Sequence, residues 1–246
     1  MFFKTLGNAS SRIRLIWLHG WGVDHSTLML LATQFLQYDN YLIDFAGFGQ
    51  SEFDNSIHDL SDYTKTVYDF IKKLDSKITI VIGHSFGGRV AIKLASEYKD
   101  CLDGIILLAG AGLKYRRNIW FGMYATFVEK FAPIIKKIFP FIAKIKIGSS
   151  DYRNLSREMK DVFNKVIKED LSDDAKKIKG VPTLLIYGEK DTAAPSYFGE
   201  EYHEYIDGSQ LDIISGADHF SILFDHNKQT QYFINKFLKE KINVLL

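Results

Sequence analysis

The feature that most constrains the fold is a serine framed by glycines, Gly83-His84-Ser85-Phe86-Gly87, which follows the apolar run 78–82 directly. A stretch with helical character, 89–98, comes next. A serine at so sharp a strand-to-helix turn has a strained backbone, and bulky neighbours would clash with the adjoining strand and helix. The turn lifts the hydroxyl above the sheet, beside a helix N-terminus that favours developing negative charge. The pattern therefore predicts Ser85 to be a nucleophile on a strand–turn–helix elbow.

A serine hydroxyl is a poor nucleophile at neutral pH and needs a base, which itself needs an orienting acid. The chain has seven histidines, and His219 is the best placed of them. It lies far downstream of Ser85 in a loop after the strand-like segment 211–214, from which a side chain can reach back over the sheet. His84 is expected to point away from the tip of the elbow. We therefore predict His219 to be the base.

Three carboxylates are candidates for the orienting acid. The strand-like run 182–187 leads into a polar loop that contains Glu189 and Asp191, and Asp218 directly precedes the candidate base. Asp191 is the preferred acid. Glu189 and Asp218 fit less well, because loop carboxylates of this kind are more often solvated.

The chain order Ser85, Asp191, His219, on strands that alternate with helices, resembles the α/β-hydrolase superfamily. The resemblance covers nearly the whole chain, and its motifs occur in the expected order: Leu18-His19-Gly20-Trp21-Gly22, Asp44-Phe45-Ala46-Gly47-Phe48-Gly49-Gln50-Ser51, the serine elbow, Gly188-Glu189-Lys190-Asp191 and Gly216-Ala217-Asp218-His219. It implies an α/β fold with a mostly parallel sheet flanked by helices. It also implies catalysis without a cofactor or a metal.

The resemblance also assigns an oxyanion loop to His19-Gly20-Trp21-Gly22. A tetrahedral intermediate needs two backbone N–H donors aimed at its oxygen. One is expected from Phe86, the residue after the nucleophile, and the second, by position, from Trp21. The alternative is an ordinary glycine-rich turn.

Alternating apolar and amphipathic segments predict one α/β core. The expected strands are 13–18, 40–45, 78–82, 104–109, 182–187 and 210–214, with any strand before residue 12 being short. The expected helices are 25–37, 59–74, 87–99, 196–205 and 221–240. Continuous apolar strands suit a parallel sheet that is buried on both faces.

The interval 113–179 breaks this rhythm, since it is too long for one crossover helix. We interpret it as a helical cap inserted into a core made of 1–112 and 180–246. Its apolar residues recur at steps of three or four, which predicts amphipathic helices. A helix is expected over 155–169. The aromatic residues predicted to line an acyl pocket are Trp120, Phe121, Tyr124 and Phe127.

Charge is concentrated in the same interval. Residues 113–147 contain eight basic side chains and one acid, whereas the whole chain has a net charge of +1. A basic, aromatic, amphipathic surface suits an acidic carrier protein or an anionic membrane surface. The alternative is a solvated face above a pocket. The near-neutral chain gives no case for nucleic acid.

Composition and the lack of recognisable targeting and metal-binding patterns limit the class and location of the protein. The 246 residues are 46% hydrophobic and 25% charged, which is ordinary for a globular protein. The single cysteine, Cys101, excludes an internal disulfide and suits a reducing compartment. We found no signal-peptide pattern, membrane-spanning run, zinc-ligand spacing or phosphate-binding loop. A cytoplasmic location is therefore expected, and nothing in the pattern sets an oligomeric state.

These patterns together favour a serine hydrolase that cleaves carboxylic esters or thioesters with an apolar acyl group. Serine at position 85 disfavours the dehalogenase and epoxide hydrolase branches, which resemble this fold but place aspartate there. Two alternatives stay open. One is a carbon–carbon bond hydrolase of the same fold, and the other is a ligand receptor that retains the three residues without turnover.

Overall fold

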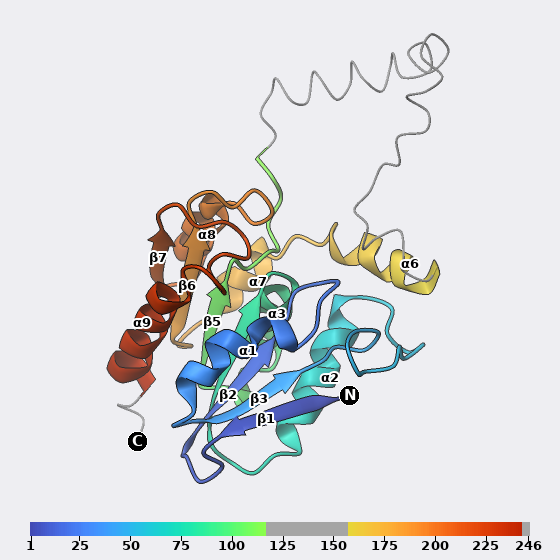
Figure 1. The fold of residues 1–246 in the computed structure, drawn as a ribbon. Helices are drawn as coiled ribbons and strands as arrows, with labels where there is room; N and C mark the ends of the chain where they lie inside the picture. Colours follow the sequence, from blue (N-terminus) through green and yellow to red (C-terminus); the bar gives the residue numbers. More distant parts are fainter. Residues whose placement is uncertain (117–156, 243–246) are drawn as a thin grey trace.

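The computed structural model describes residues 1–116 and 157–242, and within them seven strands form one sheet (Figure 1). The strand order across the sheet is β1-β3-β2-β4-β5-β6-β7. The strands are β1 (Phe3–Gly7), β2 (Ile13–Leu18), β3 (Asp39–Ile43), β4 (Ile78–His84), β5 (Gly104–Leu108), β6 (Thr183–Gly188) and β7 (Gln210–Ile214). The α/β-hydrolase fold class predicted from the sequence is confirmed.

The sheet is parallel except at one edge. β1 pairs antiparallel with β3, so that Phe3 lies opposite Ile43. All other neighbouring strands run parallel. Every residue of β2, β5 and β6 is buried, as expected for strands covered on both faces. Because the strands are parallel, their carboxyl ends share one edge of the sheet, and the loops that follow them meet there.

Helices cover both faces of the sheet (Figure 1). They are α1 (Ser26–Ala32), α2 (Leu60–Lys72), α3 (Phe86–Glu97), α6 (Arg157–Val166), α7 (Ser172–Lys177), α8 (Ser196–Tyr205) and α9 (Asn227–Phe237). Shorter turns of helix are η1 (Thr33–Phe35), η2 (Lys99–Cys101) and η4 (Leu238–Ile242). α1 and α9 pack together on one face, whereas α2, α3, α7 and α8 follow one another on the other. No helix in these ranges is both long and apolar enough to cross a bilayer.

Several element boundaries differ from the sequence prediction, such as that of α1, which ends at Ala32 rather than at 37, and for two of them the structure gives a reason. The last long helix begins at Asn227 rather than at 221, because turns occupy the preceding residues and the His226 N–H donates to the Ser221 carbonyl. β5 ends at Leu108 because Ala109 has a φ of 47°, which lies outside the strand region.

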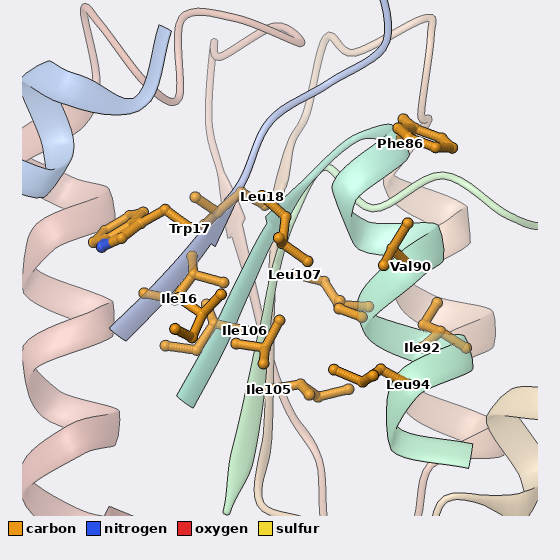
Figure 2. Packing of buried hydrophobic residues seen from close by; sticks show 14 of the residues in the cluster. Ile16, Trp17, Leu18, Phe86, Val90, Ile92, Leu94, Ile105, Ile106 and Leu107 are labelled. Carbon is orange, nitrogen blue, oxygen red and sulfur yellow. The ribbon is translucent and has the colours of Figure 1, made fainter. Parts of the chain in front are cut away.

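The core beneath the elbow is made by apolar side chains of β2, β5 and α3 (Figure 2). Trp17 and Ile106 have no exposed surface, and Val90 of α3 packs in the same cluster. Each fully buried side chain of this size contributes about 1.5–3 kcal/mol of hydrophobic stabilisation. The start of α3, and with it the elbow, is therefore held firmly against the sheet.

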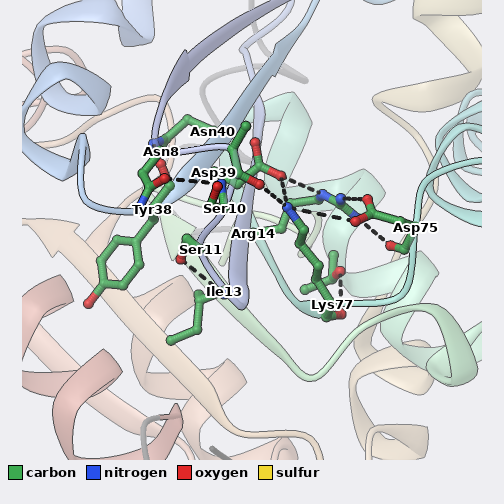
Figure 3. Close-up of polar contacts among 12 residues, drawn as sticks. Asn8, Ser10, Ser11, Ile13, Arg14, Tyr38, Asp39, Asn40, Asp75 and Lys77 are labelled. Carbon is green, nitrogen blue, oxygen red and sulfur yellow. Dashed lines mark hydrogen bonds and ion pairs between the residues drawn. The ribbon is translucent and has the colours of Figure 1, made fainter.

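An ionic network with a buried centre at Arg14 and Asp39 lies at the amino ends of the strands (Figure 3). The Arg14 Nε donates to the Asp39 carboxylate at 3.3 Å, and the Lys77 Nζ donates to the same carboxylate at 2.8 Å. Arg14 also contacts the side chain of Asp75 and is only 1% exposed. The network joins β2, β3 and the loop before β4 at the edge of the sheet opposite Ser85.

Part of the interval 113–179 can be compared with its prediction. α6 matches the helix expected over 155–169, with Met159, Val162 and Val166 buried. The predicted pocket residues Trp120, Phe121, Tyr124 and Phe127 lie outside the described residues, as does most of the basic segment. The division into core and cap therefore stays a prediction.

Candidate active site

Ser85 occupies a strained turn between β4 and α3. Its φ of 53° and ψ of −108° lie where side chains rarely occur, which costs on the order of 1–3 kcal/mol. The Ser85 N–H donates to the Leu108 carbonyl at 3.1 Å, which anchors the turn to β5. The residue is half-buried. The surrounding structure thus holds Ser85 in the conformation that the glycine-framed motif predicts.

The elbow glycines are required by close backbone contacts. A Cβ atom at Gly83 would lie 2.3 Å from the backbone oxygen of Gly87. A Cβ atom at Gly87 would lie 2.2 Å from the backbone oxygen of Leu18. Neither contact can be relieved by moving a flexible side chain, so both positions need glycine.

Asp191 and His219 form a hydrogen-bonded pair in the loops after β6 and β7. The His219 Nδ1 lies 2.7 Å from the Asp191 Oδ2, and the Asp191 side chain is fully buried. Asp191 Oδ1 accepts further hydrogen bonds from the backbone N–H groups of Ala193 and Ala194, at 2.8 and 2.9 Å. A carboxylate can only accept, so the Nδ1 atom must carry the proton and the Nε2 atom is left to accept one.

The other two candidate acids hold the loop that carries His219. Glu189 accepts from the Ser215 hydroxyl and the Gly216 N–H, both at 2.8 Å, and the backbone bond lowers its pKa. Asp218 accepts from the Ser221 N–H at 2.8 Å, which likewise lowers its pKa. Both carboxylates are thus used in turns, whereas Asp191 alone of the three is bonded to the imidazole.

Ser85 and His219 both follow strands at the carboxyl end of the parallel sheet. The ring of His84, the residue before the serine, lies 4.8 Å from the ring of His219 between centroids. Among the described residues no hydrogen bond joins the Ser85 hydroxyl to the imidazole. The structure therefore joins Asp191 with His219 and places Ser85 nearby, and the three acting as one unit stays a prediction.

The predicted oxyanion loop lies against the elbow. The Gly87 N–H donates to the His19 carbonyl at 3.1 Å, and a Cβ atom at Gly20 would lie 3.4 Å from the Ser85 Cβ. The rings of Trp21 and Phe86 are 5.1 Å apart. Within the described ranges the backbone N–H groups of these two residues make no hydrogen bond. They are therefore available as donors to a ligand oxygen.

His19 shapes this loop and is unsuited to be a base. Its Nδ1 atom lies 2.7 Å from the Gly20 carbonyl, and its Nε2 atom accepts from the Phe45 N–H at 3.1 Å. Both ring nitrogens are thus occupied. Burial lowers the pKa of His19, so the ring stays neutral.

A cavity of about 600 Å³ opens beside Ser85. Its walls are mainly apolar and come from the predicted oxyanion loop, the elbow, α6 and the start of α8. The lining includes Trp21, Phe86, Leu113, Phe163, Val166 and Phe198. A volume of this size fits a small ligand, and the apolar lining favours an apolar group next to the serine.

Arg89 is a buried cation in the cavity wall that the sequence analysis did not single out. Its guanidinium donates to the backbone carbonyls of Val166 and Glu169, both at 2.9 Å. Lys93, one turn further along α3, pairs with the Glu169 carboxylate at 2.9 Å. α3 thereby holds the end of α6 over the cavity. The signal in the sequence was a cation in the apolar first half of the helix, which gave no indication of its partner.

One group of side chains in the described ranges has metal-ligand composition: Asp24, His25 and Asp44. Asp44 Oδ1 accepts from both the backbone and the ring of His25 at 2.8 Å, and its Oδ2 accepts from the Gln50 N–H at 2.9 Å. These bonds fix the loop after β3. Both oxygens of the Asp44 carboxylate therefore already serve to hold that loop.

Known proteins resemble this chain over most of its length. A model of the Alpha/beta hydrolase family matches residues 15–230. A pimeloyl-[acyl-carrier protein] methyl ester esterase from Wigglesworthia glossinidia brevipalpis is 24% identical over 218 residues, which cover 79% of this chain and 80% of that protein.

Solved structures give the same fold. An esterase from Exiguobacterium antarcticum superposes with a TM-score of 0.75 at 20% identity, covering 97% of this chain and 95% of that one. MenH from S. aureus superposes with a TM-score of 0.73 at 22% identity, covering 97% and 98%. At these identities the superpositions bear on the fold alone.

Proposed function

The chain belongs to the α/β-hydrolase family, and from that premise we propose that it is a serine esterase acting through Ser85, His219 and Asp191. The observation that carries this proposal is the elbow. A serine with a φ of 53° lines an apolar cavity, and the preceding residue, His84, contacts a histidine whose Nδ1 is bonded to a buried carboxylate. A protein with only a structural role would gain nothing from the strain stored at this turn.

In the proposed mechanism Ser85 Oγ attacks the ester carbonyl while His219 Nε2 takes its proton. The carbonyl oxygen becomes an oxyanion and accepts hydrogen bonds from the N–H groups of Trp21 and Phe86. His219 then gives the proton to the leaving alcohol or thiol, and an acyl-enzyme remains on Ser85. A water activated by His219 releases the acid and restores the serine.

Asp191 has two tasks in this scheme. Its bond to the His219 Nδ1 leaves the Nε2 lone pair free to take the proton of Ser85, and its charge stabilises the imidazolium that forms when the serine loses its proton. The hydrogen bonds that Asp191 accepts from two backbone N–H groups hold the carboxylate in place. The orientation of the carboxylate therefore does not depend on the substrate.

For the substrate we propose an ester with an apolar acyl chain, because the cavity walls beside Ser85 are apolar. The relative from Wigglesworthia is named for a methyl ester on an acyl-carrier protein. We further propose that an acidic carrier protein delivers the acyl chain to this site. The eight basic residues of 113–147 are its motivation.

The test is hydrolysis of p-nitrophenyl esters of increasing acyl length, with Ser85→Ala as the matched variant. We expect turnover by the parent and a loss on the order of 10⁴-fold or more in the variant. Turnover that survives in Ser85→Ala would refute the assignment. Parallel assays with a vinylogous diketone would detect carbon–carbon cleavage, and ligand binding without any turnover would favour a receptor.

A further inference from the structure

His84 precedes the proposed nucleophile and is fully buried against the proposed base, although the sequence indicated only a residue that points away from the elbow tip. It is the last residue of β4 and has no exposed surface. Its Nε2 lies 3.0 Å from the backbone carbonyl oxygen of His219. The ring also packs against Phe220, with centroids 5.4 Å apart. One side chain therefore bridges the strand of the serine and the loop of the histidine.

We propose that His84 is a positioning residue, which holds the backbone of His219 so that the imidazole is directed to Ser85. This inference rests on the proposed function, since it assumes that His219 is the base. The backbone of His219 is held by His84, and its ring is held at Nδ1 by Asp191. These two hydrogen bonds act at different atoms of one residue, so together they restrict both its backbone position and its ring orientation.

The proton of His84 is fixed by its surroundings. A carbonyl oxygen can only accept, so Nε2 carries the proton. The Nδ1 atom has no hydrogen-bond partner within the described residues, and a Cβ atom at Gly20 would lie 3.2 Å from it. The unprotonated Nδ1 atom of His84 thus packs against Gly20 of the predicted oxyanion loop.

The ring also stays uncharged. Burial, together with the neighbouring charge of His219, lowers the pKa of His84 to about 3. Asp191 and His19 are the other titratable groups that act on it. A neutral ring keeps one tautomer across the working range of pH, and it does not repel the imidazolium of His219 during turnover.

The effect on rate follows from geometry. Misplacing a reacting group by 1 Å can cost roughly a hundredfold in rate. Without the bond from His84, the loop after β7 is held by Glu189 and Asp218 at its turns, and the backbone at His219 loses its contact with β4. The loss should fall on kcat, because His84 is not among the residues that line the cavity.

The experiment compares His84→Gln with His84→Met. Glutamine keeps an uncharged N–H donor, whereas methionine has a similar length and none. We expect kcat of the Gln variant to stay near that of the parent. The Met variant should lose roughly ten- to hundredfold in kcat with little change in KM. Equal kcat values in the two variants would overturn the inference.

Proton NMR supplies a readout that does not depend on turnover. The Nδ1 proton of His219, bonded to Asp191, should give a downfield signal that persists in His84→Gln and broadens or shifts in His84→Met. An unchanged signal in His84→Met would overturn the positioning role. Failure of the proposed function would show separately, as turnover that survives in Ser85→Ala.

Nitrogen NMR of the parent protein decides the matter if neither variant folds. The histidine spectrum should show His84 protonated at Nε2 and unprotonated at Nδ1 from neutral pH down to the onset of acid unfolding. A proton on Nδ1, or titration of His84 near neutral pH, would overturn the inference without any variant.

Discussion

Replacing Asp191 with asparagine should disable the proposed base while leaving the fold in place. The Oδ1 atom of Asp191 accepts the N–H groups of Ala193 and Ala194, and the Oδ2 atom faces the His219 Nδ1 at 2.7 Å. The asparagine oxygen can keep both backbone bonds, which places its NH₂ group toward the imidazole. The ring must then present a lone pair at Nδ1 and carry its proton on Nε2, where it can no longer take one from Ser85.

The expected loss in kcat follows from the change of the His219 tautomer. A wrong tautomer in a triad of this kind lowers kcat about 10⁴-fold, equivalent to about 5.4 kcal/mol in the activation free energy. The free energy of unfolding should fall by only about 1–3 kcal/mol, since one charge-assisted hydrogen bond is lost and two backbone bonds remain. Stopped-flow or plate assays of p-nitrophenyl ester hydrolysis, together with urea denaturation, measure the two quantities.

Glu189→Gln is the matched control. Glu189 lies two residues from Asp191, and its Oε2 atom accepts from both Ser215 and Gly216, so an amide oxygen in that place can keep both bonds. We expect its activity to stay close to that of the parent. If Glu189→Gln were the more damaging change, or if Asp191→Asn kept more than about a tenth of the activity, the assignment of the acid would be wrong.

Four further outcomes are expected. Gly83→Ala should lower the free energy of unfolding by about 3 kcal/mol or more in urea, because its Cβ would lie 2.3 Å from a backbone oxygen of α3. Arg14→Met should cost about 1–3 kcal/mol, since it removes one of the two cations that bond the buried Asp39 carboxylate while Lys77 remains. Cys101 should react slowly with iodoacetamide at pH 8 until the protein unfolds, because burial raises the pKa of this thiol to about 12. Phe163→Ala should move the preferred acyl chain to greater length, at about 0.8 kcal/mol per added methylene that the enlarged cavity buries.

Each of these expectations has a clear contrary result. An unchanged urea midpoint in Gly83→Ala would show that the elbow tolerates a side chain. A stable Arg14→Met variant would mean that the network at the amino ends contributes little. Rapid alkylation of native Cys101 would contradict its burial, and an unchanged chain-length profile in Phe163→Ala would exclude α6 from the acyl site.

The sheet and the proximity of Asp191 to His219 could be predicted because both depend on local patterns and one rule of topology. Continuous apolar runs fix β2, β4, β5 and β6, and the glycines around Ser85 fix the turn. The carboxyl ends of parallel strands share one edge, so residues that follow β6 and β7, such as Asp191 and His219, must lie near each other. That geometry, rather than spacing in the sequence, brought together residues 28 positions apart.

The contacts of His84 and Arg89 could not be predicted, because each depends on a backbone carbonyl far away in the chain. His84 reaches the carbonyl of a residue 135 positions later, and Arg89 reaches carbonyls 77 and 80 positions later. Every residue has a carbonyl, so the sequence does not mark the acceptor. The antiparallel pairing of β1 was also hidden, since five residues at a sheet edge, mostly exposed, give little apolar signal.

The most direct test of the account is the site and stoichiometry of labelling by a fluorophosphonate, which reacts preferentially with a serine that a base activates. We predict one label per chain, located at Ser85 by peptide mass mapping, with labelling strongly reduced in His219→Ala and absent in Ser85→Ala. Labelling at another residue, or an equal rate in His219→Ala, would contradict the proposal that this elbow is the active site.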